Sequence, residues 1–161
     1  MLEAVALLVI ALLAAVDQII KYVVLLRLKP VGTSMVIDNV FQLRYIENTG
    51  AAFSILENAT TILSVVTAVV ILLGLWAVVT KKIKSKFLYF CIVIVLAGGI
   101  GNFIDRVYRG FVIDYFEVLF VRFAVFNFAD CLITVGAFMM IGYIVYEAVQ
   151  EYKMKKGAKN E

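Results

Sequence analysis

Four long apolar segments dominate the sequence. They cover residues 4–26, 60–80, 87–104 and 131–149, and each is close to the length of about 20 residues that a helix needs to cross a bilayer. Hydrophobic residues make up 64% of the 161 residues, whereas a soluble domain is usually nearer half apolar. The sequence therefore predicts four transmembrane helices in a single membrane domain over residues 1–161. We expect the first segment to be a retained helix, because Glu3 precedes it in place of a basic leader.

Most of the lysines lie in two clusters beside the apolar segments. The first cluster comprises Lys81, Lys82, Lys84 and Lys86, and the second comprises Lys153, Lys155, Lys156 and Lys159. Loops rich in lysine stay on the cytoplasmic side of a membrane. With four spans, both termini are then expected in the cytoplasm and segments 27–59 and 105–130 on the outer side. All five arginines lie in these two outer segments.

The two outer segments contain strand patterns. Residues 40–47 alternate, with Phe41, Leu43 and Tyr45 on one face, as in a half-buried strand. Residues 111–120 are rich in β-branched and aromatic side chains. We therefore expect a mostly helical membrane fold with a small extracytoplasmic β-sheet, whose apolar side faces lipid or a lipidic ligand.

Composition excludes several kinds of site. The chain has no histidine, which rules out Ser-His-Asp and Cys-His catalysis and any histidine-ligated metal. Cys91 and Cys131 lie in separate apolar segments and are interpreted as small core residues. The net charge is +3, but the lysines flank membrane segments, so no nucleic-acid partner is expected. We predict no metal and no other cofactor.

Polar side chains in or beside a membrane span are costly and mark functional sites by default. Asp17 and Lys21 are spaced i, i+4 in the first apolar segment and share a helix face. They could form a proton relay, but we favour a structural ion pair that ties this helix to its neighbours, because a paired buried carboxylate tends to stay ionised.

Further polar groups lie at the outer ends of the segments. Asn48 could hold a peptide backbone or form an ordinary Asn-x-Gly turn. Asn102 and Arg106 are spaced i, i+4 and face the same way. Asp105 is expected to be charge-paired with the adjacent Arg106 rather than catalytic.

Asp114 and Asp130 occupy different surroundings. Asp114 lies in an apolar stretch, while Asp130 lies at the start of the fourth apolar segment, with Asn127 three residues earlier as a possible cap. Two carboxyl groups in unequal environments suit general acid–base hydrolysis, with Asp114 as the protonated acid and Asp130 as the ionised base. From the pattern alone we favour an isolated strand acid and a helix cap, because sequence spacing does not show whether the two meet.

Five motifs together resemble one known family, the bacterial lipoprotein signal peptidases, or signal peptidase II. The resemblance covers essentially the whole chain, in order and spacing. The motifs are D-Q-x-x-K at 17–21, N-T-G-A-A-F at 48–53, G-N-x-x-D-R at 101–106, V-I-D-Y-F at 112–116 and F-N-x-A-D at 126–130.

This resemblance implies an aspartic endopeptidase of the bacterial cytoplasmic (inner) membrane, with its active site on the outer side. It implies cleavage of the signal peptide from a diacylglyceryl-modified prolipoprotein, just before the lipidated cysteine. The catalytic pair of the family corresponds to Asp114 and Asp130. The supporting polar positions correspond to Asn48, Asn102, Arg106 and Asn127, whereas Asp17, Lys21 and Asp105 are interpreted as structural polar groups.

The partners expected are therefore the prolipoprotein substrate and membrane lipid, with the enzyme acting as a monomer. We expect Arg106 and Asn48 to donate hydrogen bonds to carbonyl oxygens of the bound peptide. Two alternatives fit the residues less well. A small proton-coupled transporter would carry polar groups through the full membrane depth, and an assembly subunit would not need two carboxylates in these motifs.

Overall fold

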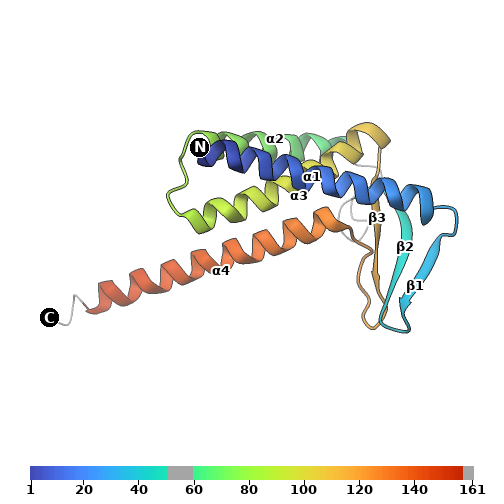
Figure 1. Cartoon of the computed structure of the whole chain (residues 1–161). Helices are drawn as coiled ribbons and strands as arrows, with labels where there is room; N and C mark the ends of the chain where they lie inside the picture. Colours follow the sequence, from blue (N-terminus) through green and yellow to red (C-terminus); the bar gives the residue numbers. More distant parts are fainter. Residues whose placement is uncertain (51–59, 158–161) are drawn as a thin grey trace.

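The computed structural model describes residues 1–50 and 60–157 (Figure 1). Four of its helices are long and apolar enough to cross a membrane, and a small sheet accompanies them, which confirms the predicted fold class. The elements in chain order are α1 (Leu2–Arg27), β1 (Thr33–Ile37), β2 (Phe41–Asn48), α2 (Thr60–Val79), α3 (Lys86–Arg109), β3 (Val112–Val118) and α4 (Phe128–Gly157).

Helix α3 is the central element, because it contacts α1, α2 and α4. Its side chains pack with those of α1 and α2 in one apolar core, which includes Ile10, Val78 and Leu96. Among the four spanning helices, α3 has the largest share of its apolar window buried inside the protein. The other three helices therefore expose most of their apolar surface, as expected of helices that face lipid.

Two glycines of the G-G-I-G run at 98–101 let α3 approach its neighbours closely. A Cβ added at Gly98 would collide with the carbonyl oxygen of Ala129 on α4, and one at Gly101 would meet the carboxylate of Asp17 on α1. The intervening Gly99 has only Ile71 near its missing Cβ, at an ordinary contact distance of 3.8 Å. The run thus brings α1, α3 and the start of α4 together at one level.

The predicted ends of two helices were wrong. Helix α3 continues past 104 to Arg109 and ends at Gly110, whose φ of 80° suits glycine. Its charged last turn stays helical because Asp105 pairs with Arg109 one turn later. Helix α4 begins at Phe128 instead of 131 and extends beyond 149 to Gly157, with a Glu151–Lys155 ion pair in its polar end.

The three strands form an antiparallel sheet in the order β1-β2-β3, placed at one end of the helices (Figure 1). In the pairing of β2 with β3, Leu43 opposes Phe116 and Ile46 opposes Asp114. Two residues of β2 therefore lie opposite the single residue Tyr115 of β3, and this arrangement is a β-bulge. Because the bulge reverses the alternation of β2, Asn48 lies on the same face as Asp114 instead of the opposite one.

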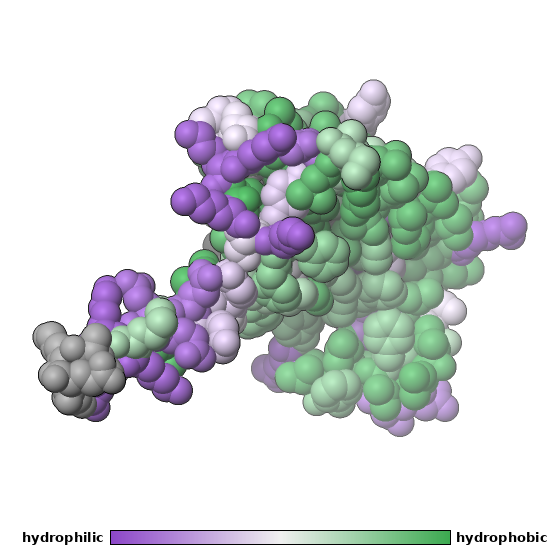
Figure 2. Space-filling model, turned by 60° about the vertical axis from the view of Figure 1, so that its left-hand side comes forward, coloured by the Kyte–Doolittle hydropathy of each residue, from purple (hydrophilic) through white to green (hydrophobic). Residues whose placement is uncertain are grey.

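The described lysines of both clusters lie at the end of the molecule opposite the sheet. The α2–α3 connection and the end of α4 occupy this end in Figure 1. Figure 2 shows hydrophilic side chains gathered there, with a broad apolar surface beyond them. Polar ends and an apolar middle are the distribution that a bilayer requires of a multi-pass protein.

We predict opposite effects for two neighbouring glycine substitutions. Gly98→Ala should lower the apparent melting temperature in detergent, because overpacking against the α4 backbone costs about 1–3 kcal/mol. Gly99→Ala should leave it unchanged or raise it, since alanine favours a helix by up to about 1 kcal/mol over glycine. Equal melting temperatures for the two variants would contradict the close α3–α4 contact.

Candidate active site

Asp114 on β3 and Asp130 on α4 meet at one cavity. The side-chain amide of Asn127 donates to Asp114 Oδ1 at 2.7 Å, and that of Asn102 donates to Asp130 Oδ1 at 2.7 Å. The Asn127 amide also donates to Asn102 Oδ1 at 3.1 Å, which links the two halves. Both aspartates line a cavity of about 250 Å³. The structure thus brings together two residues whose proximity the sequence left open.

Asp130 is fixed by the cap of its own helix. Its backbone N–H donates to Asn127 Oδ1 at 2.9 Å, and its Oδ2 accepts from the Asn127 backbone N–H at 3.1 Å. This reciprocal pair is a capping box, with Asn127 as the cap and Asp130 as the third helical residue. The sequence predicted the cap but not the reciprocity. The positive end of the helix and the hydrogen bonds from Asn127 and Asn102 favour the carboxylate form of Asp130, and they oppose the effect of its burial.

Asp114 has a different electrostatic environment. It is buried, with 2% of its surface exposed. Burial raises the pKa of Asp114 to about 7, and the nearby charge of Asp130 acts in the same direction. Hydrogen bonds from Asn48 and Asn127 lower this pKa but only partly offset the burial. Asp114 can therefore hold a proton near neutral pH, which a general acid needs.

Asn48 forms the turn that the sequence offered as one alternative, and its side chain also contacts Asp114. Its Oδ1 accepts from the Gly50 backbone N–H at 2.9 Å, and its Nδ2 donates to Asp114 Oδ2 at 2.8 Å. Both ends of the amide are therefore engaged within the protein. Asn48 is therefore an orienting group for Asp114. Its amide nitrogen carries two N–H donors, so donation to a bound peptide stays a prediction.

The expected Asp105–Arg106 pair was wrong. Asp105 pairs with Lys21 at 2.9 Å and with Arg109 at 2.5 Å, because adjacent residues of a helix point in different directions. Arg106 instead lines the cavity and donates to the backbone oxygen of Gly50 at 3.4 Å. Asn102 lines the same cavity, which confirms that the two share a face. The rest of the N-T-G-A-A-F motif, residues 51–53, lies outside the described residues.

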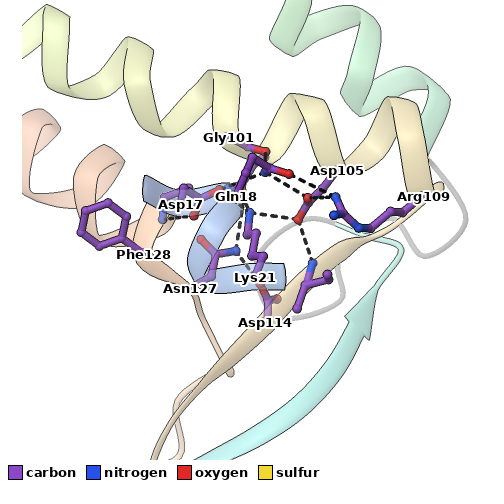
Figure 3. A network of polar contacts seen from close by, with 12 residues as sticks. Asp17, Gln18, Lys21, Gly101, Asp105, Arg109, Asp114, Asn127 and Phe128 are labelled. Atoms are coloured by element: carbon purple, nitrogen blue, oxygen red, sulfur yellow. Dashed lines mark hydrogen bonds and ion pairs between the residues drawn. The ribbon is translucent and has the colours of Figure 1, made fainter. Parts of the chain in front are cut away.

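A buried ionic cluster lies close to Asp114 (Figure 3). Lys21 pairs with Asp17 as predicted, at 2.9 Å, and with Asp105 on α3. Two further members of the network, Gln18 and Arg109, were not predicted as site residues, although Gln18 is part of the first motif. Gln18 Nε2 donates to Asp105 and to the Gly101 carbonyl oxygen. The i, i+4 spacing of Asp105 and Arg109 could have predicted the place of Arg109 in the network.

A larger cavity of about 620 Å³ adjoins the first. Asp114 and Asn48 line both cavities, as does the segment 123–125. The larger cavity extends between the end of β2 and residues 117–125. An extended chain could therefore run past Asp114 from one cavity into the other.

Comparison with known proteins identifies the family of this chain. A sequence profile described as Signal peptidase (SPase) II matches residues 9–146. The chain belongs to the signal peptidase II family. It is 34% identical over 147 residues to a lipoprotein signal peptidase of Streptococcus pneumoniae, covering 91% of this chain and 96% of the relative. A lipoprotein signal peptidase of Clostridioides difficile is 40% identical over 139 residues, covering 86% and 93%.

The fold also matches a solved structure. A structure described as a bacterial membrane enzyme has a TM-score of 0.81 to this chain at 26% identity, covering 90% of each. As a member of the signal peptidase II family, the chain is a multi-pass membrane protease. The transporter alternative is not supported, and neither is an assembly subunit without catalytic activity.

The raised pKa of Asp114 predicts a titration that infrared spectroscopy can follow. As pH falls through about 7, the signal peptidase in detergent should gain the C=O stretch of a protonated carboxyl group. Asp114→Asn should lose this band, while the exposed Asp38→Asn should keep it. A band that survives in Asp114→Asn would assign the proton to another group.

Proposed function

We propose that Asp114 and Asp130 are the catalytic pair of an aspartic endopeptidase. The observation that carries the proposal is that the two carboxyl groups line one cavity in unequal environments. Asp114 is buried with a pKa raised to about 7, while Asp130 is held by a helix cap and by Asn102. Such a difference assigns the acid and the base of a hydrolytic pair.

The proposed reaction uses one water molecule. Asp130 takes a proton from this water as its oxygen attacks the scissile carbonyl carbon, and protonated Asp114 donates its proton to the carbonyl oxygen. The tetrahedral intermediate then collapses, the C–N bond breaks, and the leaving nitrogen takes the proton held by Asp130. The hydroxyl proton of the intermediate returns to Asp114, so the pair ends as it began.

Arg106 is proposed to hold the peptide backbone. It lines the cavity together with Asp114 and Asp130, and its guanidinium already donates to a backbone carbonyl, that of Gly50. A guanidinium has five N–H donors, so others are left for a carbonyl oxygen of the substrate.

All groups of this mechanism come from a single chain, which supports the prediction of an active monomer.

The substrate class follows from the family and from the lining of the site. We propose a diacylglyceryl-modified prolipoprotein, cleaved before its lipidated cysteine. Apolar side chains line the smaller cavity beside the two aspartates, including Phe126 and Ile133, and the cavity lies where apolar helices meet the sheet. Acyl chains held in the lipid would place the scissile bond at this depth. Equal cleavage of lipid-modified and unmodified precursors would contradict this positioning of the scissile bond by the acyl chains.

The orientation in the cytoplasmic membrane is likewise proposed. The described lysines of both clusters lie at one end and the cavity at the other, so cytoplasmic lysines place the site on the outer side. A precursor that has begun to cross the membrane would present its cleavage site there.

Conservative substitution tests the catalytic pair. Asp114→Asn and Asp130→Asn should each lower kcat by about 10²- to 10⁴-fold or more, since each removes one partner of acid–base catalysis. The double variant should be little slower than either single one, because groups that act as a unit are not additive. The assay is cleavage of a lipid-modified precursor in detergent, with folding checked by melting temperature. Turnover near the wild-type rate in either single variant would remove that residue from the mechanism.

Cysteine labelling tests the orientation. In a cleavage-competent variant without Cys91 and Cys131, Lys29→Cys should react with an impermeant thiol reagent added outside intact cells. Lys84→Cys and Lys156→Cys should react only after the cells are opened. External labelling at residue 84 would invert the proposed topology.

A further inference from the structure

The buried ionic cluster contacts the chain immediately before each aspartate of the pair. Asp17 Oδ1 accepts from the backbone N–H of Ala129 at 3.1 Å, one residue before Asp130. Asp105 Oδ2 accepts from the backbone N–H of Ile113 at 3.1 Å, one residue before Asp114. The start of α4 and the start of β3 are thus each held by a carboxylate from a different helix.

Lys21 joins these two anchors. Its Nζ lies 2.9 Å from Asp17 Oδ2 and 2.9 Å from Asp105 Oδ2, with all three side chains fully buried (Figure 3). Its third contact, at 2.9 Å, is to Asn102 Oδ1, and the amide of Asn102 donates to Asp130. An ammonium group has three donors. Through Asp17, Asp105 and Asn102, each of the three contacts connects Lys21 to the chain at or next to Asp114 or Asp130.

The contact with Asn102 also fixes which way that amide points. Both Lys21 and Asn127 donate to Asn102 Oδ1. The oxygen of the amide is therefore held toward two donors, and its nitrogen must face Asp130. Without Lys21, the amide could turn and present its oxygen to the carboxylate, which would remove a hydrogen bond that favours the ionised base.

We propose that Lys21 is the positioning residue of the catalytic pair. Through Asp17 and Asp105 it sets the separation of Asp130 and Asp114, and through Asn102 it orients the base. This inference rests on the proposed catalytic pair, and it assigns to Lys21 an effect on turnover beyond structural stability.

The charge of Lys21 adds an effect that a merely structural residue would not have. It lowers the pKa of Asp114, opposing the effects of burial and of Asp130. Removing this cation should therefore raise the pKa of Asp114, so that the acid keeps its proton to higher pH. Among the described residues, the other charged groups that face Asp114 or line its two cavities are Arg106, Glu47, Glu117 and Arg122.

Replacement of Lys21 by an uncharged side chain of similar shape tests the proposal. In the full chain, Lys21→Met should lower kcat on a lipid-modified precursor by about 10-fold or more with little change in KM, since a small misplacement of reacting groups has a large effect. The alkaline limb of its pH–rate profile should move to higher pH. Lys29→Met is the matched control, because Lys29 forms an exposed ion pair at the same 2.9 Å distance, with Glu47. The control should retain wild-type kcat and pH profile.

A second pair of variants decides the question if Lys21→Met does not fold. Asp17→Asn keeps an oxygen that can accept from the Ala129 N–H, whereas Asp17→Ala does not. The asparagine variant should have a kcat at least about 10-fold above that of the alanine variant at equal KM. Equal kcat values for these two variants would overturn the proposal.

A folded Lys21→Met protein with wild-type kcat and pH profile would also overturn it. Either result would leave the catalytic pair intact, provided that Asp114→Asn and Asp130→Asn still abolish cleavage. Activity in those two variants would instead refute the proposed function itself.

Discussion

A lysine buried between two carboxylates is the interaction on which the rest of this structure depends. Lys21, Asp17 and Asp105 are fully buried among helices that face lipid, where an unpaired charge would be very unfavourable. Breaking a buried pair typically costs about 3–5 kcal/mol, because the remaining charge is left uncompensated. The three side chains must therefore stay together, and with them α1 and α3.

The same cluster holds the first residues of the two elements that carry the proposed catalytic pair. Because Asp17 and Asp105 each accept a backbone N–H from the first residues of α4 and β3, those elements are held at the depth of the ionic cluster. Gly101 permits this arrangement, since any larger residue would occupy the space of the Asp17 carboxylate. The ionic cluster, the glycine run and the helix cap thus support one another around a single cavity.

The apolar segments were sufficient to predict the four helices and the mostly helical membrane fold. Their ends were predicted less well, because charged residues were taken to end the spans. Asp105 remains inside α3 because its charge is compensated by Lys21 on another helix and by Arg109 one turn later. The first of these contacts joins segments far apart in the chain, so hydropathy alone does not reveal it.

The sequence predicted local contacts of the candidate site, such as the Asp17–Lys21 pair and the Asn127 cap, but not its long-range contacts. The motifs identified Asp114 and Asp130, whereas their meeting depends on long-range packing. The bulge in β2 turns Asn48 toward Asp114, and no turn residue in the sequence predicts this bulge. Arg106 was assigned to Asp105 because the two are adjacent in the chain, although helix geometry separates neighbouring side chains.

The dependence of cleavage rate on pH tests most directly whether two unequal carboxyl groups share the chemistry. The rate on a lipid-modified precursor should follow a bell-shaped curve, with both limbs belonging to the pair. It should fall as pH rises through about 7, the raised pKa of Asp114, because the pair then loses its shared proton, and fall again in acid, where the pair binds a second proton. A rate that stays constant, or continues to rise, as pH increases well beyond 7 would contradict the role of Asp114 as the acid.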